Sequence, residues 1–211
     1  MLSAINLKGL LVTQDSGAQL NRTQHIVELF DSTESLVETV AAFLSEGLGQ
    51  GHAALAVMRL EQWNLVAARL TGRKVPLSDA IASGQLRVLD GTRTLARIML
   101  HGAPCRGLFE EVMGKTVRQL CSTEIRLRVY WDLVDVLAAD GNFHAAHELE
   151  KMWSDLTEQE PVTVLCGYSV ATFANPDARD TLRWICRSHM KMRSNRAAAS
   201  LAQTAGVDQH N

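Results

Sequence analysis

The sequence has no long hydrophobic run and no excess of one charge sign. No apolar stretch approaches the roughly 20 residues that a membrane-spanning helix needs, and the first 24 residues lack a basic segment followed by a long apolar one. The formal net charge of −2 argues against a nucleic-acid-binding protein, since such proteins usually have a clustered basic excess. We therefore expect a cytoplasmic protein that has no membrane partner and for which nucleic acid is a disfavoured partner.

Catalytic and metal-binding signatures are missing as well. The cysteines form no CxxC pair, which favours buried thiols over a zinc or redox motif; they are Cys105, Cys121, Cys166 and Cys186. The sequence also contains no G-x-S-x-G elbow, no H-E-x-x-H pair and no G-x-G-x-x-G fingerprint. These absences predict a protein that is not an enzyme and that uses no cofactor and no metal.

Segments with strand-like and helix-like patterns alternate along the 211 residues. Compact apolar segments predict strands at 25–30, 52–58, 85–89, 125–131 and 162–168. Apolar residues at helical spacing predict helices at 36–48, 61–70, 77–83, 95–100, 108–121, 133–138 and 143–156, with a last helix from Pro176 to about Lys191. Such alternation predicts an α/β fold, a three-layer sandwich with a mainly parallel sheet. We expect an arm over 1–23, one domain over 24–192 and a flexible tail over 193–211.

Five segments, in this order, resemble the MEDS domain, the methanogen/methylotroph DcmR sensory domain. They lie at 25–36, at 43–48, between Gly141 and Trp153, at 165–168 and at 185–189. The resemblance covers about residues 24–192. It implies a degenerate relative of the RecA/KaiC ATPases, of the kind attached to histidine kinases, other signalling modules or DNA-binding regulators.

By that analogy residues 30–36 occupy the place of the phosphate-binding loop of the ATPases. A working loop, G-x-x-x-x-G-K-[ST], needs glycines so that backbone amides can surround the phosphates, and a lysine that reaches the β and γ oxygens. Asp31-Ser32-Thr33-Glu34 contains neither, and its two carboxylates would repel phosphate even though a helix N-terminus favours anions. The resemblance therefore implies a fold of RecA/KaiC type, and the residues of this segment predict that it has no functional Walker A loop.

Several polar residues follow predicted strands and should meet at the carboxyl edge of the sheet, where open α/β folds bind ligands. No nucleophile with an adjacent base occurs among them, so they predict a binding pocket for a small ligand and not a catalytic site. The family usually has Gly-Glu where this chain has Trp131-Asp132, a departure that would narrow or close the pocket. The candidate cleft consists of His25, Asp31, Ser32, Thr33, Glu34, Asp132 and Tyr168.

Four histidines are candidate ligands. His144 and His147 are three residues apart on a helix and could bind a metal, but a solvated helix face explains them more simply. His25 and His189 match recurring family positions, where a partly buried histidine with satisfied hydrogen bonds is favoured over a ligand or a proton sensor. Cys186 and His189 are the candidate sensing residues.

A basic stripe extends along the predicted last helix at four-residue spacing: Arg179, Arg183, Arg187 and Lys191. A solvated surface is the first interpretation of it, a protein partner the second and nucleic acid the third. The partner that we expect is a signalling protein: a histidine kinase, a response regulator or a transcription regulator. Homo-oligomerisation is expected only by analogy with RecA-like proteins.

Together these features predict a non-catalytic sensory or regulatory domain in bacterial or archaeal signal transduction. Occupancy of the cleft would shift a conformational population, and the last helix would report that shift. Two alternatives stay open at this point. One is a residual ATPase that uses Asp31, Glu34, Glu61 and Asp132 with magnesium, and the other is a DNA-associated regulator that acts through the basic stripe.

Overall fold

The computed structural model describes residues 24–121, 126–173 and 191–194, together with Ala178, Thr181 and Ile185. Its centre is a sheet in the order β3-β2-β6-β7-β1-β8, in which every pairing is parallel. The strands are β1 (Gln24–Phe30), β2 (Ala53–Met58), β3 (Leu86–Asp90), β6 (Leu127–Trp131), β7 (Val162–Ser169) and β8 (Lys191–Ser194). The predicted α/β fold with a mainly parallel sheet is confirmed.

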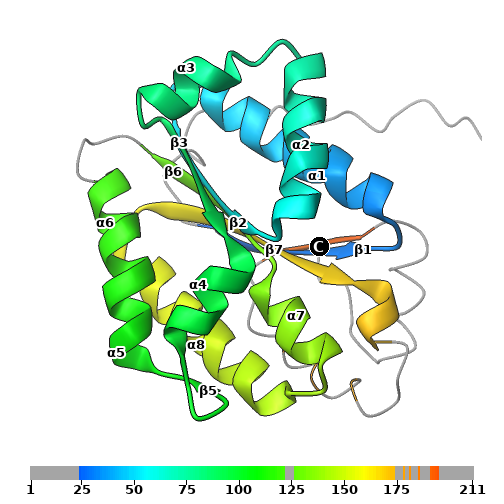
Figure 1. Cartoon of the computed structure of the whole chain (residues 1–211), viewed down its shortest axis with the longest axis vertical. Helices are drawn as coiled ribbons and strands as arrows, with labels where there is room; N and C mark the ends of the chain where they lie inside the picture. Colours follow the sequence, from blue (N-terminus) through cyan, green and yellow to red (C-terminus); the bar gives the residue numbers. More distant parts are fainter. Residues whose placement is uncertain are drawn as a thin grey trace, which may run out of the picture.

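Helices cover both faces of this sheet, which makes a three-layer sandwich (Figure 1). One face is covered by α1 (Thr33–Gly49), α2 (Leu60–Gly72) and α3 (Leu77–Ala82). The other face is covered by α4 (Gly91–Ile98), α5 (Arg106–Phe109), α6 (Lys115–Cys121), α7 (Leu133–Ala139) and α8 (Phe143–Gln159).

The strands separate two hydrophobic cores because successive side chains point to opposite faces. In β2, Ala54 and Ala56 pack with α1 and α2, whereas Leu55 and Val57 pack with the helices of the opposite layer. All six residues of β2 are buried. This explains the uninterrupted apolar run in the sequence, because neither face of a strand covered on both sides contacts water and neither favours polar residues.

The start of α4 differs from the predicted helix at 95–100. Asp90 caps the helix by accepting a hydrogen bond from the Arg93 amide at 3.3 Å, and the helix begins at Gly91. A Cβ atom on Gly91 would lie 2.9 Å from the Met58 carbonyl carbon, so only glycine allows this close approach to β2. Beyond Ile98 the chain forms a hairpin in which β4 (Met99–Leu100) pairs with β5 (Ala103–Pro104).

The predicted helix at 108–121 is present but not uniform. A π-helical turn, Glu110–Gly114, joins α5 to α6, so the three segments form one continuous helical stretch. A π turn is rare and inserts one extra residue into the helical ladder.

The predicted extent of the last helix is wrong at its C-terminal end. Thr181 and Ile185 are helical and buried, but Lys191 begins β8, which pairs with residues 26–29 of β1. Without β8, the backbone amides and carbonyls on that side of β1 would form an open sheet edge. Lys191 is therefore a strand residue, and it does not continue a helical basic stripe.

We predict that Trp153→Ala lowers the free energy of unfolding by about 3–5 kcal/mol. Trp153 is fully buried and makes edge-on contacts with Trp131 and Phe109, at ring-centroid distances of 4.9 and 5.6 Å. Urea unfolding followed by circular dichroism measures the effect. Leu65→Ala is the matched control because that side chain is about half exposed, and it should change the free energy of unfolding by less than about 1 kcal/mol.

Candidate ligand-binding site

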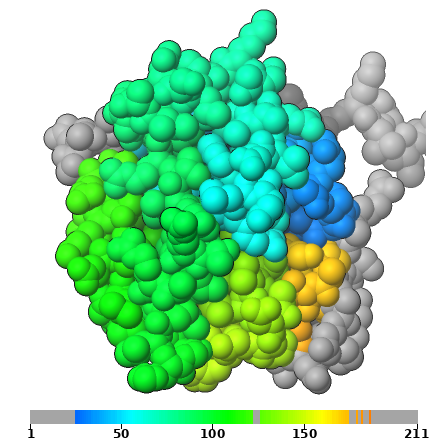
Figure 2. All heavy atoms as spheres, in the orientation of Figure 1, coloured from blue at the N-terminus to red at the C-terminus, as the bar shows by residue number. Residues whose placement is uncertain are grey.

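A cavity of about 270 Å³ lies at the carboxyl edge of the sheet. The segments that follow β1, β2, β6 and β7 surround it, and in Figure 2 the start of α2 (cyan), α7 (yellow-green) and the end of β7 (orange) meet on the surface at this edge. The chain leaves β1 and β2 toward one face and β6 toward the other, so the cavity occupies a switch point of the topology. Its lining residues are Phe30, Asp31, Ser32, Thr33, Leu36, Arg59, Gln62, Asp132, Asp135, Gly167, Tyr168 and Ser169.

Two residues, Asp31 and Ser32, connect β1 to α1. Ser32 has extended backbone geometry and is the N-cap: its Oγ accepts a hydrogen bond from the Ser35 amide at 3.2 Å and donates one to Asp31 Oδ1 at 3.1 Å. The capping function explains why serine follows the strand here. The connection places exposed hydroxyl and carboxylate groups at the rim of the cavity.

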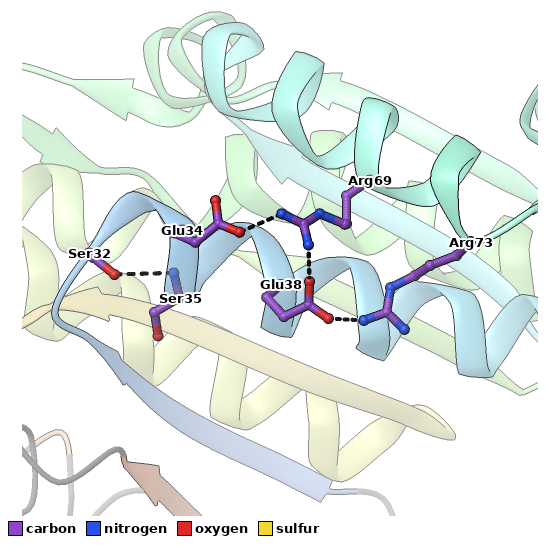
Figure 3. Close-up of polar contacts among 6 residues, drawn as sticks. All are labelled: Ser32, Glu34, Ser35, Glu38, Arg69 and Arg73. Carbon is purple, nitrogen blue, oxygen red and sulfur yellow. Dashed lines mark hydrogen bonds and ion pairs between the residues drawn. The ribbon is translucent and has the colours of Figure 1, made fainter.

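Glu34 is directed to α2 and does not line the cavity (Figure 3). Its carboxylate pairs with Arg69, which also binds Glu38 Oε2 at 2.7 Å, and Arg73 pairs with the same Glu38. These pairs join α1 to α2. Because all four side chains are at least one-third exposed, water and salt screen them and each pair contributes little to stability.

A polar row crosses the floor of the cavity from α2 to α7. With its amide oriented to match its neighbours, Gln62 donates a hydrogen bond to Asp132 Oδ2 at 2.8 Å and accepts one from Arg59 at 2.8 Å. Arg59 is exposed at the start of α2, whereas Asp132 is only 3% exposed. Asp132 Oδ1 is also buried and has no hydrogen-bond partner among the residues that the structure describes.

The second buried carboxylate of the cavity, Asp135, is fixed by its neighbours. Asp135 Oδ1 accepts hydrogen bonds from the Ser169 amide at 2.9 Å and from Thr172 Oγ1 at 2.8 Å. These bonds connect the first turn of α7 to the end of β7 and to η2, the short 3-10 helix Val170–Phe173. Asp135 is therefore a structural clamp, whereas Asp132 keeps an oxygen for a further donor.

Burial governs the ionisation of both carboxyl groups. It raises the pKa of Asp132 to about 7; Arg59 opposes this shift and Asp135 adds to it. Burial also raises the pKa of Asp135, although the bonds from Ser169 and Thr172 favour its ionised form. A carboxyl with a pKa near neutrality holds or releases a proton easily, which suits recognition of a polar ligand.

Behind the floor of the cavity lies a second polar group that is fully enclosed. Tyr168 donates a hydrogen bond to Glu150 Oε1, and His25 Nε2 lies 3.1 Å from Cys166 Sγ and 3.5 Å from Glu150 Oε2. Burial raises the pKa of Glu150 to about 8, and it raises the pKa of Cys166 well above its ordinary value. His25 thus belongs to this enclosed group and does not line the cavity.

The structure brings part of the predicted cleft together at one cavity: Asp31, Ser32, Thr33, Asp132 and Tyr168 line it, whereas His25 and Glu34 do not. Whether these residues bind a ligand stays a prediction. Cys186 and His189 lie outside the described residues, as do Arg179, Arg183 and Arg187 of the stripe.

Sequence reasoning missed Arg59, Gln62 and Asp135 as lining residues. A signal for Arg59 was present, because it directly follows the apolar strand β2, just as Asp132 follows β6. Gln62 and Asp135 lie one helical turn farther on, and only the start positions of α2 and α7 bring them to the cavity.

The two histidines of α8 differ in how far they are exposed to solvent. His144 is exposed, and His147 is half-buried with a pKa lowered chiefly by burial. Neither belongs to the group of possible metal ligands that occurs within the described part of the chain. The solvated-face interpretation therefore holds for His144 but only partly for His147.

The comparison with protein families adds to this geometry. The profile of the MEDS family, described as the MEthanogen/methylotroph, DcmR Sensory domain, matches residues 24–189. The chain belongs to the MEDS family. The match spans β1 to β7 and includes all the lining residues of the cavity, so the cavity lies within this MEDS domain. A search of curated proteins found no match. Among the helices that the structure describes, none has the length and apolar character to cross a membrane.

We predict that the free energy of unfolding decreases as the pH rises from about 4 to about 7. The folded state holds the Asp132 proton up to a pKa of about 7, whereas the unfolded state releases it near pH 4, so raising the pH across this interval favours unfolding. Asp132 can contribute at most about 1.4 kcal/mol per pH unit. Urea unfolding at several pH values measures the slope.

Asp132→Asn should make that slope shallower by up to about 1.4 kcal/mol per pH unit, because the amide does not titrate. The buried carboxyls of Asp135 and Glu150, whose pKa values are also raised, keep their part of the slope. Asp31→Asn is the matched control, since Asp31 is exposed at the rim of the same cavity, and it should keep the slope of the unsubstituted protein. An unchanged slope in Asp132→Asn would show that Asp132 ionises as freely in the folded as in the unfolded state.

Proposed function

We propose that this MEDS domain is a non-catalytic sensor that binds a small hydroxylated molecule in the cavity at the carboxyl edge of its sheet. The observation that supports this most directly is Asp132 Oδ1, a buried acceptor without a partner among the described residues, next to a cavity with polar walls. A buried acceptor left unsatisfied costs about 1–3 kcal/mol, which a ligand that donates a hydrogen bond would recover.

The chemistry of the floor favours a hydroxyl group over a charged one. A hydroxyl can donate to Asp132 and accept from the exposed guanidinium of Arg59 at the same time. A carboxylate ligand would be repelled by Asp31, Asp132 and Asp135. An ammonium ligand would be attracted by these carboxylates but repelled by Arg59, whereas a hydroxyl group is compatible with both. A cavity of about 270 Å³ lies near the lower end of the volumes of ligand sites, which suits a small molecule.

The connection between β1 and α1 supports a function without ATP hydrolysis. Only Asp31 and Ser32 separate strand from helix, so there is no loop long enough to wrap around a phosphate chain. Descent from RecA/KaiC-type ATPases, which the resemblance implies, is part of this proposal: the site would have kept the position of the nucleotide cleft and lost its phosphate loop.

The signal would leave through the segment after β7. Asp135 connects the floor of the cavity to Ser169 and Thr172, and Phe173 and Ile185 are buried against the same core layer. A ligand that binds the two states of this segment with different affinity shifts their populations by that difference and no more. The receiving partner would be a histidine kinase, a response regulator, a transcription regulator or a second copy of the chain.

We predict that a small alcohol or diol raises the melting temperature and that Asp132→Asn and Arg59→Ala weaken this binding at least 10-fold, the effect of losing about 1.4 kcal/mol. The probes are methanol, ethanol, ethane-1,2-diol and glycerol, with acetate and ethylamine as charged comparisons. Thermal shift gives the first measurement and calorimetric titration the affinity. Glu34→Gln is the matched control, because Glu34 lies in the first turn of α1, next to the lining residue Thr33, but pairs with Arg69 outside the cavity.

The same protein, incubated with ATP and magnesium, should release no phosphate above a blank without protein. Phosphate release that disappears in Asp132→Ala would overturn the non-catalytic part of the proposal. Equal response to all probes, or a response that survives both cavity substitutions, would overturn the assignment of the ligand site.

A further inference from the structure

The enclosed polar group behind the cavity contains three types of metal-binding side chain. The imidazole of His25, the carboxylate of Glu150 and the thiol of Cys166 each offer one ligand atom, and these atoms all lie within 4.8 Å of one another. The exposed fractions of the three residues are 4%, 0% and 1%. Such a group is unexpected in the interior of a sheet protein, where apolar residues would pack at lower cost.

Three rigid elements hold the group in place. β1 and β7 are adjacent parallel strands in which His25 lies opposite Val164 and Val27 lies opposite Cys166. The alternation of the strands directs His25 and Cys166 to the face covered by α8, the helix that contains Glu150. Ligands on strands and helices, and not on loops, are the arrangement that fixes a metal site most firmly.

The spacing suits a tetrahedral ion. Zinc bonds of about 2.0–2.3 Å at tetrahedral angles place the ligand atoms about 3.3–3.7 Å apart. Here His25 Nε2 lies 3.1 Å from Cys166 Sγ and 3.5 Å from Glu150 Oε2. The ligand atoms of Glu150 and Cys166 lie within 4.8 Å of each other, so binding an ion requires side-chain rotations that bring all three distances to about 3.3–3.7 Å.

The mixture of ligands selects the kind of metal. Thiolate and imidazole favour zinc over magnesium or calcium, which prefer oxygen ligands. Tyr168, which donates to Glu150 Oε1, would orient the carboxylate as an outer-shell partner. Three protein ligands leave a fourth position, as in zinc sites that bind a water or a small molecule.

We propose that His25, Glu150 and Cys166 bind one Zn²⁺ ion between β1, β7 and α8. The site stands apart from the ligand proposed for the cavity, since none of its three ligands lines that cavity. Tyr168 belongs to both, because its hydroxyl reaches Glu150 and its residue lines the cavity wall. The site could not be found from the sequence, because its ligands form no short motif. More than 100 residues separate His25 from Glu150.

The test uses the full chain, stripped with a chelator and titrated with Zn²⁺ or with Co²⁺ as a spectroscopic substitute. We expect one ion per chain, tetrahedral d–d bands with Co²⁺ and a thiolate-to-cobalt charge-transfer band. Cys166→Ala should abolish the charge-transfer band, and Glu150→Gln should weaken Zn²⁺ binding at least 10-fold. Tyr168→Phe keeps the ring but loses the bond to Glu150, and it should weaken binding about 10- to 100-fold.

Matched controls separate this site from other thiols and from the cavity. Cys105→Ala, Cys121→Ala and Cys186→Ala should each keep the charge-transfer band, and Asp132→Asn should keep the Zn²⁺ affinity within about twofold. Circular dichroism of each stripped variant confirms that it is folded. Should the folded, unsubstituted chain bind no stoichiometric Zn²⁺, or should the band survive Cys166→Ala, the proposal is overturned whatever the cavity binds.

Discussion

The burial of the parallel sheet on both faces is the constraint on which the rest of the structure depends. Strands such as β2 have no water on either side, so each backbone polar group must pair within the sheet and each side chain must be apolar or have a polar partner. Polar side chains are consequently concentrated where the strands end. The cavity collects the first residues after β1, β2 and β6, which are Asp31, Arg59 and Asp132.

Within that interior the group of His25, Glu150 and Cys166 is the exception, and it has a physical cost. Each of its side chains is almost completely buried, and burial disfavours the ionised forms of the carboxyl and the thiol. Hydrogen bonds within the group reduce this cost. Sites that break the pattern of their surroundings are where function is most often found, which supports a functional interpretation of this group.

The sequence predicted the layers well because their cause is local. Runs such as Ala53–Met58 and the apolar periodicity after Ser32 report burial and helix capping within a few residues, and both elements lie where they were expected. The end of the last helix was wrong for a non-local reason: whether Lys191 continues a helix or forms β8 depends on the open edge of β1, more than 160 residues earlier.

The candidate site was predicted in outline for the same reason. Residues directly after a strand, such as Asp132, could be placed at the sheet edge from pattern alone. The sequence could not show that Glu34 lies outside the cavity, because its ion pair with Arg69 depends on how α2 packs beside α1. His25 lies near the amino end of β1, whereas the carboxyl end of that strand reaches the cavity. The register of β1 and β7 shows which residues it joins instead, because it brings His25 close to Cys166.

The clamp formed by Asp135 sets a threshold for any molecule that is to change the segment after β7. Its two hydrogen bonds, from Ser169 and Thr172, together stabilise the resting arrangement by about 1–3 kcal/mol. A ligand that breaks these two hydrogen bonds loses that amount of binding free energy, which lowers its affinity 5- to 150-fold. A molecule that fills the cavity and leaves both hydrogen bonds intact would not change the segment after β7. Such a molecule would act as an antagonist of ligands that break the clamp.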